Sequence, residues 1–159
     1  MNEDASAFQF RSATNADRGE IENLVYAVLG EFGLAPDPET TDADLKDIQS
    51  HYLDRGGVFE VVISAQGKIV GCWGLYPMDE GACELRKMYL SPEVRGLGLG
   101  KETLRRALSR GKELGFRRMT LETASALKDA IRLYKAAGFR PYRAEHLSSR
   151  TDQCFELNL

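Results

Sequence analysis

Residues 88–105 read MYLSPEVRGLGLGKETLR, and this stretch decides the fold of the chain. It passes from an apolar strand end, through a proline-bearing turn, into a glycine-dense loop that opens a helix. Glycine lets a backbone approach a bulky ligand closely, and unpaired N–H groups at a helix start attract anions. Arg95 and Lys101 add positive charge at the two margins of the loop. The stretch therefore predicts a phosphate or pyrophosphate site whose loop residues are Gly96, Leu97, Gly98, Leu99 and Gly100.

The two common nucleotide-binding motifs do not fit this loop. A P-loop would need glycine at position 95 and serine or threonine at position 102, where the chain has Arg95 and Glu102. A dinucleotide-binding fingerprint would need a third glycine at position 101 or 103, where the chain has Lys101 and Thr103. A glycine-rich connection that binds no ligand stays open as the alternative at this point.

The composition is that of one globular domain, predicted to span residues 1–159. A net charge of −3 argues against a nucleic-acid-binding surface. No apolar run is long enough for a membrane span, and Met1–Ser12 does not resemble a secretory signal. The three cysteines are widely spaced and form no C-x-x-C pattern, which indicates a reducing cytoplasm and neither disulfides nor a zinc site. The two histidines, His51 and His146, are too far apart to suggest a metal site.

Hydrophobic periodicity predicts two helices in the first third of the chain. The first carries Ile21, Leu24, Val25, Val28 and Phe32 on one face and ends near Gly33, and the second, shorter one carries Leu45, Ile48 and Tyr52. A loop from Leu34 to Asp44 joins them. The helix after the glycine loop directs Leu104, Ala107, Leu108 and Leu114 inward, and a last helix spans 126–137. Strands are predicted at 8–13, 58–64, 68–75, 82–90, 117–123, 139–143 and 153–159.

The predicted element order is βααβββαβαββ. The strand–helix–strand unit through the glycine loop implies a parallel pair with a right-handed crossover, inside an otherwise antiparallel sheet. The expected fold class is therefore α/β (α+β), with helices on both faces of a mixed sheet.

Two motifs and this element order resemble the GNAT superfamily of N-acetyltransferases. Arg-x-x-Gly-x-Gly at Arg95–Gly100 resembles the family's acyl-CoA loop, and Leu133–Phe139 resembles its helix with a Leu-Tyr-x-x-x-Gly-Phe ending. The resemblance covers nearly the whole chain. It implies acetyl-CoA as a co-substrate, no metal, and a bulge that splays the strand at 86–90 from the next parallel strand.

The resemblance also assigns roles to the backbone. Met88, Tyr89 and Leu90 would pair with the pantetheine arm, and the Leu90 N–H would stabilise the oxyanion. The amides of 96–101, with Arg95 behind them, would hold the pyrophosphate. A purely structural strand explains the apolar side chains of 88–90 equally well. The expected cofactor-binding residues are Met88, Tyr89, Leu90, Arg95, Gly96, Leu97, Gly98, Leu99, Gly100 and Lys101.

Tyr134 resembles the family's general acid, which protonates the departing thiolate; packing under the sheet is its structural alternative. Glu84 is the first candidate for handling the proton of the amine, and Glu122 is the second. A solvated glutamate explains either one as well. Strand alternation would place Glu84, Arg86 and Met88 on one face.

Three further positions concern the cofactor. Leu127 stands where family members often carry an asparagine that touches the cofactor arm, so that contact is absent. Thr103 or Arg106 could contact the distal part of CoA. Glu102 in the first helical turn is explained by compensation of the helix dipole.

The predicted function is transfer of an acetyl group to a primary amine of a small molecule or amino acid, by direct attack in a ternary complex. The alternatives are a protein or peptide N-acetyltransferase and a non-catalytic acyl-CoA sensor. The loop at 34–44 would tolerate a cationic amine, although a solvated acidic loop is the simpler explanation of Asp37, Glu39, Asp42 and Asp44. The resemblance also implies a homodimer as a candidate assembly. The net charge and the lack of a long apolar run predict neither nucleic acid nor membrane as a partner.

Overall fold

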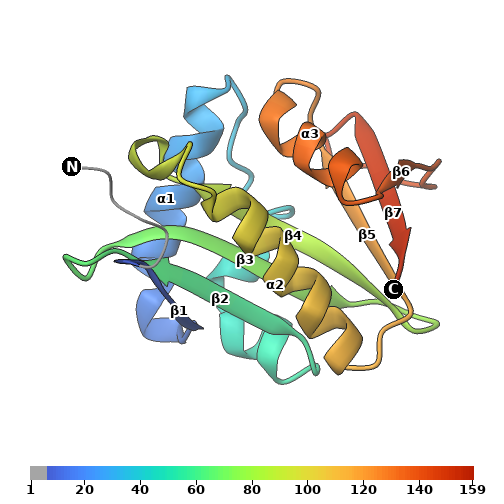
Figure 1. Ribbon diagram of the computed structural model, residues 1–159, viewed down its shortest axis with the longest axis horizontal. Helices are drawn as coiled ribbons and strands as arrows, with labels where there is room; N and C mark the ends of the chain where they lie inside the picture. Colours follow the sequence, from blue (N-terminus) through green and yellow to red (C-terminus); the bar gives the residue numbers. More distant parts are fainter. Residues whose placement is uncertain (1–6) are drawn as a thin grey trace.

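The computed structural model describes residues 7–159, so residues 1–6 of the predicted domain lie outside the described part. Its centre is a seven-stranded sheet (Figure 1) in the order β1-β2-β3-β4-β5-β7-β6. Neighbouring strands are antiparallel except for the parallel pair β4–β5, as predicted. The strands are β1 (Gln9–Ser12), β2 (Val58–Ile63), β3 (Ile69–Pro77), β4 (Ala82–Leu90), β5 (Arg118–Thr123), β6 (Arg140–Pro141) and β7 (Gln153–Asn158).

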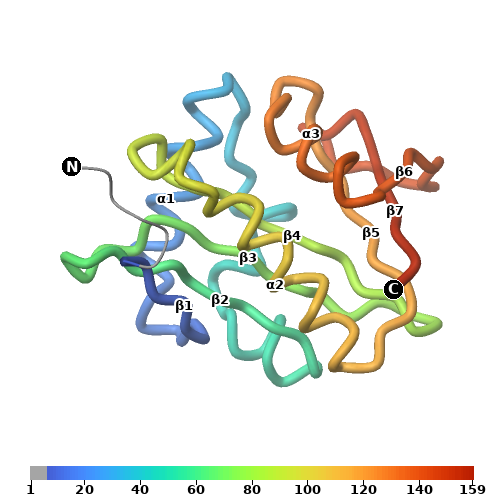
Figure 2. Tube along the Cα trace, in the orientation of Figure 1, coloured from blue at the N-terminus to red at the C-terminus, as the bar shows by residue number. Residues whose placement is uncertain are grey.

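Helices cover both faces of the sheet, and the Cα trace shows the same layering (Figures 1 and 2). Helix α1 (Arg18–Glu31) lies on one face, while α2 (Leu99–Glu113) and α3 (Lys128–Ala136) lie on the other. The prediction of a short second α-helix is wrong. The chain there forms a 3-10 turn at Ala43–Lys46 and a π turn at Gln49–Leu53. Its predicted inward residues are nevertheless buried, because Leu45, Ile48 and Tyr52 are fully enclosed.

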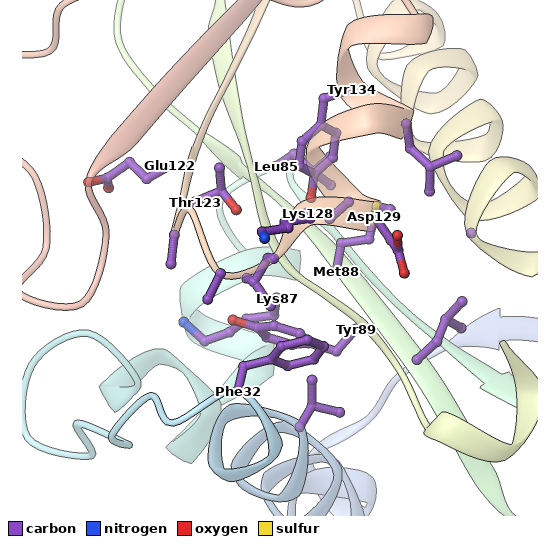
Figure 3. A pocket seen from close by; sticks show the side chains of 18 of the residues that line it. Phe32, Leu85, Lys87, Met88, Tyr89, Glu122, Thr123, Lys128, Asp129 and Tyr134 are labelled. Atoms are coloured by element: carbon purple, nitrogen blue, oxygen red, sulfur yellow. The ribbon is translucent and has the colours of Figure 1, made fainter.

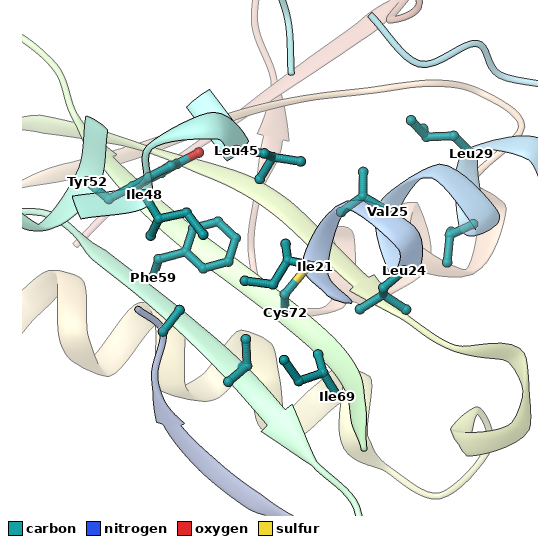
Figure 4. Packing of buried hydrophobic residues seen from close by; sticks show 13 residues of the cluster. Ile21, Leu24, Val25, Leu29, Leu45, Ile48, Tyr52, Phe59, Ile69 and Cys72 are labelled. Atoms are coloured by element: carbon teal, nitrogen blue, oxygen red, sulfur yellow. The ribbon is translucent and has the colours of Figure 1, made fainter. Parts of the chain in front are cut away.

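Each face of the sheet has its own core. Under α1, buried side chains of the helix meet those of the two short turns and the central strands (Figure 4), among them Ile21, Val25, Leu29, Leu45, Ile48, Tyr52, Phe59 and Cys72. Under α2 and α3 the core contains Trp73, Leu75, Leu104, Ala107, Met119, Leu121, Tyr134 and Phe155. Leu114 was predicted to point inward, which is wrong: it is 40% exposed, because α2 ends one residue earlier at Glu113.

The C-terminal strands differ from prediction at one place. Strand β6 holds only two residues, since Pro141 has no N–H to continue the ladder. The chain still follows β7, because the Tyr142 N–H donates to the Cys154 carbonyl at 3.1 Å. Within residues 7–159, no helix combines the length and the apolar character that crossing a membrane requires.

Candidate active site

The parallel strands β4 and β5 separate partway along their length. They are paired only at Ala82↔Arg118, Cys83↔Met119 and Glu84↔Thr120. Beyond Glu84 the two strands diverge, as Figure 1 shows, and the side of β4 that faces β5 is left without a partner strand. The splay that the family resemblance implied is therefore present.

A bulge in β4 accompanies the splay. Cys72 lies opposite Tyr89 and Gly74 lies opposite Arg86, so Lys87 and Met88 together oppose the single residue Trp73. Lys87 has a φ of 55°, in the left-handed region that a side chain disfavours. An extra residue of this kind bends a strand and interrupts its alternation.

The bulge corrects one expectation about side-chain direction. Met88 does not share a face with Glu84 and Arg86, because it packs in the core under α2 and α3. Tyr89 instead packs against the core under α1. Strict alternation fails at Met88 because the inserted residue shifts the period by one.

The backbone of Leu90 faces the splay. Leu90 lies opposite Gly71, and the next residue, Ser91, donates its N–H to the Val70 carbonyl at 2.8 Å. Hydrogen-bonded and non-bonded pairs alternate in an antiparallel ladder, so the Leu90 N–H and carbonyl point away from β3. The guanidinium of Arg95 donates to that carbonyl at 2.9 and 3.2 Å. The Leu90 N–H therefore lies on the open edge of β4.

The glycine loop has the expected form. Gly96 and Gly98 have φ values of 79° and 84°, and Gly98 is the N-cap residue of α2. The intervening leucines anchor the loop, because Leu97 and Leu99 pack in a third core cluster with Val62 and Val70. The first backbone bond of the helix runs from the Glu102 N–H to the Gly98 carbonyl at 3.1 Å. The N–H groups of residues 99–101 precede it and are the unpaired donors of a helix start.

Arg95 is already engaged by the protein. Besides the Leu90 carbonyl, it binds the carboxylate of Glu31 at the end of α1 with both terminal nitrogens, one of them at 3.0 Å. It also lies over the ring of Phe32, 5.4 Å from the centroid. Arg95 thus ties the glycine loop to α1 and to the end of β4.

A cavity of about 1070 Å³ occupies the splay and reaches both faces of the sheet. On the α2 and α3 side it is lined by Leu85, Met88, Gly96, Gly98, Gly100, Lys101, Leu127, Lys128, Leu133 and Tyr134. On the α1 side its lining includes Val28, Phe32, Leu34, Thr41, Glu84, Arg86, Lys87, Tyr89, Glu122 and Arg150. All predicted cofactor-binding residues except Leu97 and Leu99, which face the core, line this one cavity.

Tyr134 enters the cavity from α3, opposite Phe32 and Tyr89 (Figure 3). Its ring packs edge-on against Phe139 at a centroid distance of 5.8 Å. Burial raises the pKa of Tyr134 above its ordinary value, and the neighbouring Tyr89 adds to the rise. The hydroxyl therefore stays protonated at neutral pH, as a proton donor must.

The two candidate carboxylates are held by different partners. Glu84 forms an ion pair with Arg86, whose guanidinium lies 3.8 Å from the ring centroid of Tyr76. Glu122 accepts the Ser148 N–H at 2.9 Å and the Thr151 hydroxyl at 3.2 Å. Both carboxylates are half-buried and line the cavity.

A buried charge network, which the sequence did not indicate, lies beside the cavity. Arg150 binds Asp42 with both terminal nitrogens at 2.6 and 2.7 Å, and Asp42 is fully buried. The ammonium of Lys87 lies 3.2 Å from Asp42, 3.3 Å from Asp44 and 3.0 Å from the Thr41 carbonyl. The solvated acidic loop is therefore wrong for Asp42 and Asp44, and neither is free to receive an amine.

The pKa of Asp42 reflects this network. Burial alone would raise the pKa of its carboxyl group, but hydrogen bonds from Arg150 and the Asp37 N–H, with the charge of Lys87, hold it below its usual value. Only the spacing of Asp42 and Asp44 was visible in the sequence. Their partners at positions 87 and 150 are too distant along the chain for a local pattern to indicate them.

Comparison with known proteins agrees with this geometry. The model of the acetyltransferase (GNAT) family matches residues 22–139. An uncharacterized N-acetyltransferase of Escherichia coli, YjgM, is 37% identical over 134 residues, which are 81% of this chain and 80% of that protein. A GNAT-family acetyltransferase structure from Staphylococcus aureus has a TM-score of 0.89 at 24% identity, covering 96% of this chain and 99% of the other.

A GNAT phosphinothricin acetyltransferase from Sinorhizobium meliloti, solved in complex with acetyl-CoA, has a TM-score of 0.75 at 21% identity. The match covers 96% of this chain and 89% of the other, and at this identity it shows the fold alone. The family model and the E. coli relative each match most of the chain, and residues 22–139 include the splay, the bulge and the glycine loop. The chain belongs to the acetyltransferase (GNAT) family.

Proposed function

We propose that this protein transfers the acetyl group of acetyl-CoA to the primary amine of a small molecule, within a ternary complex. The observation that carries the proposal is the open edge of β4 in the splay, where the Leu90 N–H faces a cavity that also receives Tyr134. A thioester supplies an activated acyl group, so positioning, an oxyanion donor and proton transfer suffice for the reaction.

The residues of the α2 and α3 side fit acetyl-CoA. The N–H groups of residues 99–101, with Lys101, suit the pyrophosphate, since a helix start carries unpaired donors and partial positive charge. The open edge of β4 at 88–90 offers the pantetheine amides the hydrogen bonds that a neighbouring strand would make. Leu127 and Leu133 add apolar lining between these two regions.

The chain's own groups account for the chemical step. The Leu90 N–H stabilises negative charge on the acetyl carbonyl oxygen while the C–N bond forms and the C–S bond breaks. The Tyr134 hydroxyl gives its proton to the departing sulfur and regains one from solvent. Glu84, or Glu122 as the second candidate, holds the acceptor's ammonium and takes up the proton that it loses, directly or through water.

Initial velocities with acetyl-CoA and an amine panel test this function. Direct transfer in a ternary complex predicts amine-dependent thiol release, an acetylated amine 42 Da heavier by mass spectrometry, and intersecting reciprocal plots. Parallel plots with an acetylated enzyme would contradict direct attack. Binding of acetyl-CoA without turnover of any amine would favour a sensor instead.

A further inference from the structure

The two halves of the cavity differ in charge. On the α2 and α3 side, Lys101 and Lys128 line the cavity, and neither has a carboxylate within 4.0 Å in residues 7–159. On the α1 side the lining cations are Arg86, Lys87 and Arg150, and each lies against a carboxylate. The first half suits a polyanion such as CoA, so the acceptor must take the second.

Each cation of the acceptor half already has a carboxylate beside it. Arg150 binds Asp42 with both terminal nitrogens, and the Lys87 ammonium lies 3.2 Å from Asp42, 3.3 Å from Asp44 and 3.0 Å from the Thr41 carbonyl. Arg86 donates from Nε to Glu84, lies 3.9 Å from Asp44 and is stacked on Tyr76. Because these positive charges are already balanced, a carboxylate on the acceptor would add a like charge to the carboxylates of this half, which is unfavourable.

The acceptor half has carboxylate oxygens that are free to bind a cation. Glu122 uses Oε1 for the Ser148 N–H and the Thr151 hydroxyl, and Glu84 uses Oε1 for Arg86. The Oε2 atoms of both have no hydrogen-bond partner within the described residues. With Asp42 and Asp44, four carboxylates stand against three cations, so the half carries one net negative charge.

The rest of the acceptor half is largely apolar. Val28 and Phe32 of α1, Leu34 of the following loop and Tyr89 of β4 line it. Phe32 and Tyr89 lie close together at the side of the cavity away from Tyr134 (Figure 3). Such a surface stabilises an apolar or aromatic group and gives nothing to a second ammonium.

We propose that the acceptor is an amine with a single positive charge on an apolar or aromatic body, and with no carboxylate beside the amino group. The inference rests on the proposed function and narrows its substrate class. The ammonium binds the carboxylates of Glu84 and Glu122 and loses one proton there. The neutral nitrogen then forms the C–N bond as the C–S bond breaks, and the sulfur takes its proton from Tyr134. The nitrogen loses its second proton to solvent to give the amide, and Tyr134 regains a proton from solvent.

Matched acceptors test the class directly. Phenethylamine, phenylalaninamide, phenylalanine and spermidine are compared by kcat/KM for thiol release with acetyl-CoA. Values are compared at one pH near neutrality, where the acceptors still bind as ammonium ions, and each is divided by the fraction of free acceptor whose reacting amino group is neutral at that pH. We expect phenethylamine to be the best substrate, phenylalaninamide to exceed phenylalanine at least tenfold, and spermidine to be poor. A preference for phenylalanine over its amide, or for spermidine, would overturn the acceptor class and leave the acetyltransferase intact.

One pair of variants tests the carboxylate. Glu122→Gln keeps an Oε1 for Ser148 and Thr151 but removes the charge, and should raise the KM for phenethylamine about tenfold and lower kcat/KM at least as much, with the acetyl-CoA affinity little changed. Glu145→Gln, on the β6–β7 connection that supplies Ser148 and Thr151, is exposed and outside the cavity and should have no effect. An unchanged KM in Glu122→Gln would contradict its role. No turnover of any acceptor, with acetyl-CoA still bound, would overturn the proposed function as well.

Discussion

Tyr134 illustrates how position replaces acidity at the residue scale. A tyrosine is a weak acid, with a reference pKa near 10, and burial raises the pKa of Tyr134 further. In the proposed reaction, the useful property of Tyr134 is that its neutral, proton-carrying form persists over the whole physiological range. The ring packs against Phe139 and lines the cavity, which is where the proposal requires its hydroxyl.

Removing that hydroxyl should therefore affect chemistry and spare binding. We expect Tyr134→Phe to lower kcat about 100-fold, with the acetyl-CoA dissociation constant within twofold of wild type, because the ring packing is kept. Since a raised pKa extends the neutral form upward, the wild-type kcat should not fall on the basic side below about pH 10. A kcat within threefold of wild type would assign Tyr134 to packing alone.

Lys87 has a structural role, because its contacts hold the backbone of the β4 bulge in place. Its φ of 55° in the bulge is a strained backbone conformation for a residue other than glycine. Its ammonium is enclosed by Asp42, Asp44 and the Thr41 carbonyl. These contacts join the β4 bulge to the loop before the short turns, and Arg150 extends the join to the β6–β7 connection.

Lys87→Met should be strongly destabilising, since it leaves two buried carboxylates short of a counter-charge. We expect urea unfolding to show a loss of about 3 kcal/mol. The matched control is Lys46→Met, which removes an exposed lysine paired with the exposed Glu39 and should change the free energy of unfolding by less than about 0.5 kcal/mol. Equal stabilities of the two variants would show that the buried network contributes little.

At the scale of elements, the glycine loop and the start of α2 together form the proposed pyrophosphate site. The leucines of the loop are anchored in the core, and Gly98 turns the chain into the helix with a positive φ. Gly100 then lets α2 approach α3, since a Cβ there would lie 2.9 Å from Leu133 Cδ1. Gly98, Gly100 and the two leucines of the loop therefore each have a separate structural role.

Two alanine substitutions separate conformational strain from composition. Gly98→Ala meets no steric contact but needs a φ of 84°, so it should lower the free energy of unfolding by about 1 kcal/mol and weaken acetyl-CoA binding several-fold. Gly30→Ala, within α1 and also free of contacts, should raise stability by about 0.5 kcal/mol and leave binding unchanged. Identical behaviour of the two variants in denaturation and titration would refute the strain argument.

For the whole molecule, local patterns predicted the elements and their order, because helix and strand periodicity and the glycine loop are written in neighbouring residues. They failed where structure depends on distant partners. The segment at 43–53 is irregular, with Asp44 bonded to the Tyr52 hydroxyl inside the core. Lys87, Asp42 and Arg150 meet only after folding. The bulge inserts one residue in β4, so alternation placed Met88 on the wrong face.

The fold as a whole forms the candidate site because β4 and β5 separate within the sheet. The core under α2 and α3 holds β4 and β5 together near Cys83 and Met119, and beyond that point the strands part around the cavity. A ligand that fills the splay binds only the folded chain, so it should also stabilise it. At 100 times its dissociation constant, such a ligand adds about 2.7 kcal/mol.

Isothermal titration of the purified chain with acetyl-CoA is the decisive measurement, because every assigned role depends on that ligand occupying the splay. We expect binding at one site per chain, weakened in Gly98→Ala and retained in Tyr134→Phe, with thiol release once an amine is added to the same sample. Absence of binding, in a preparation that is folded by circular dichroism, would contradict the account.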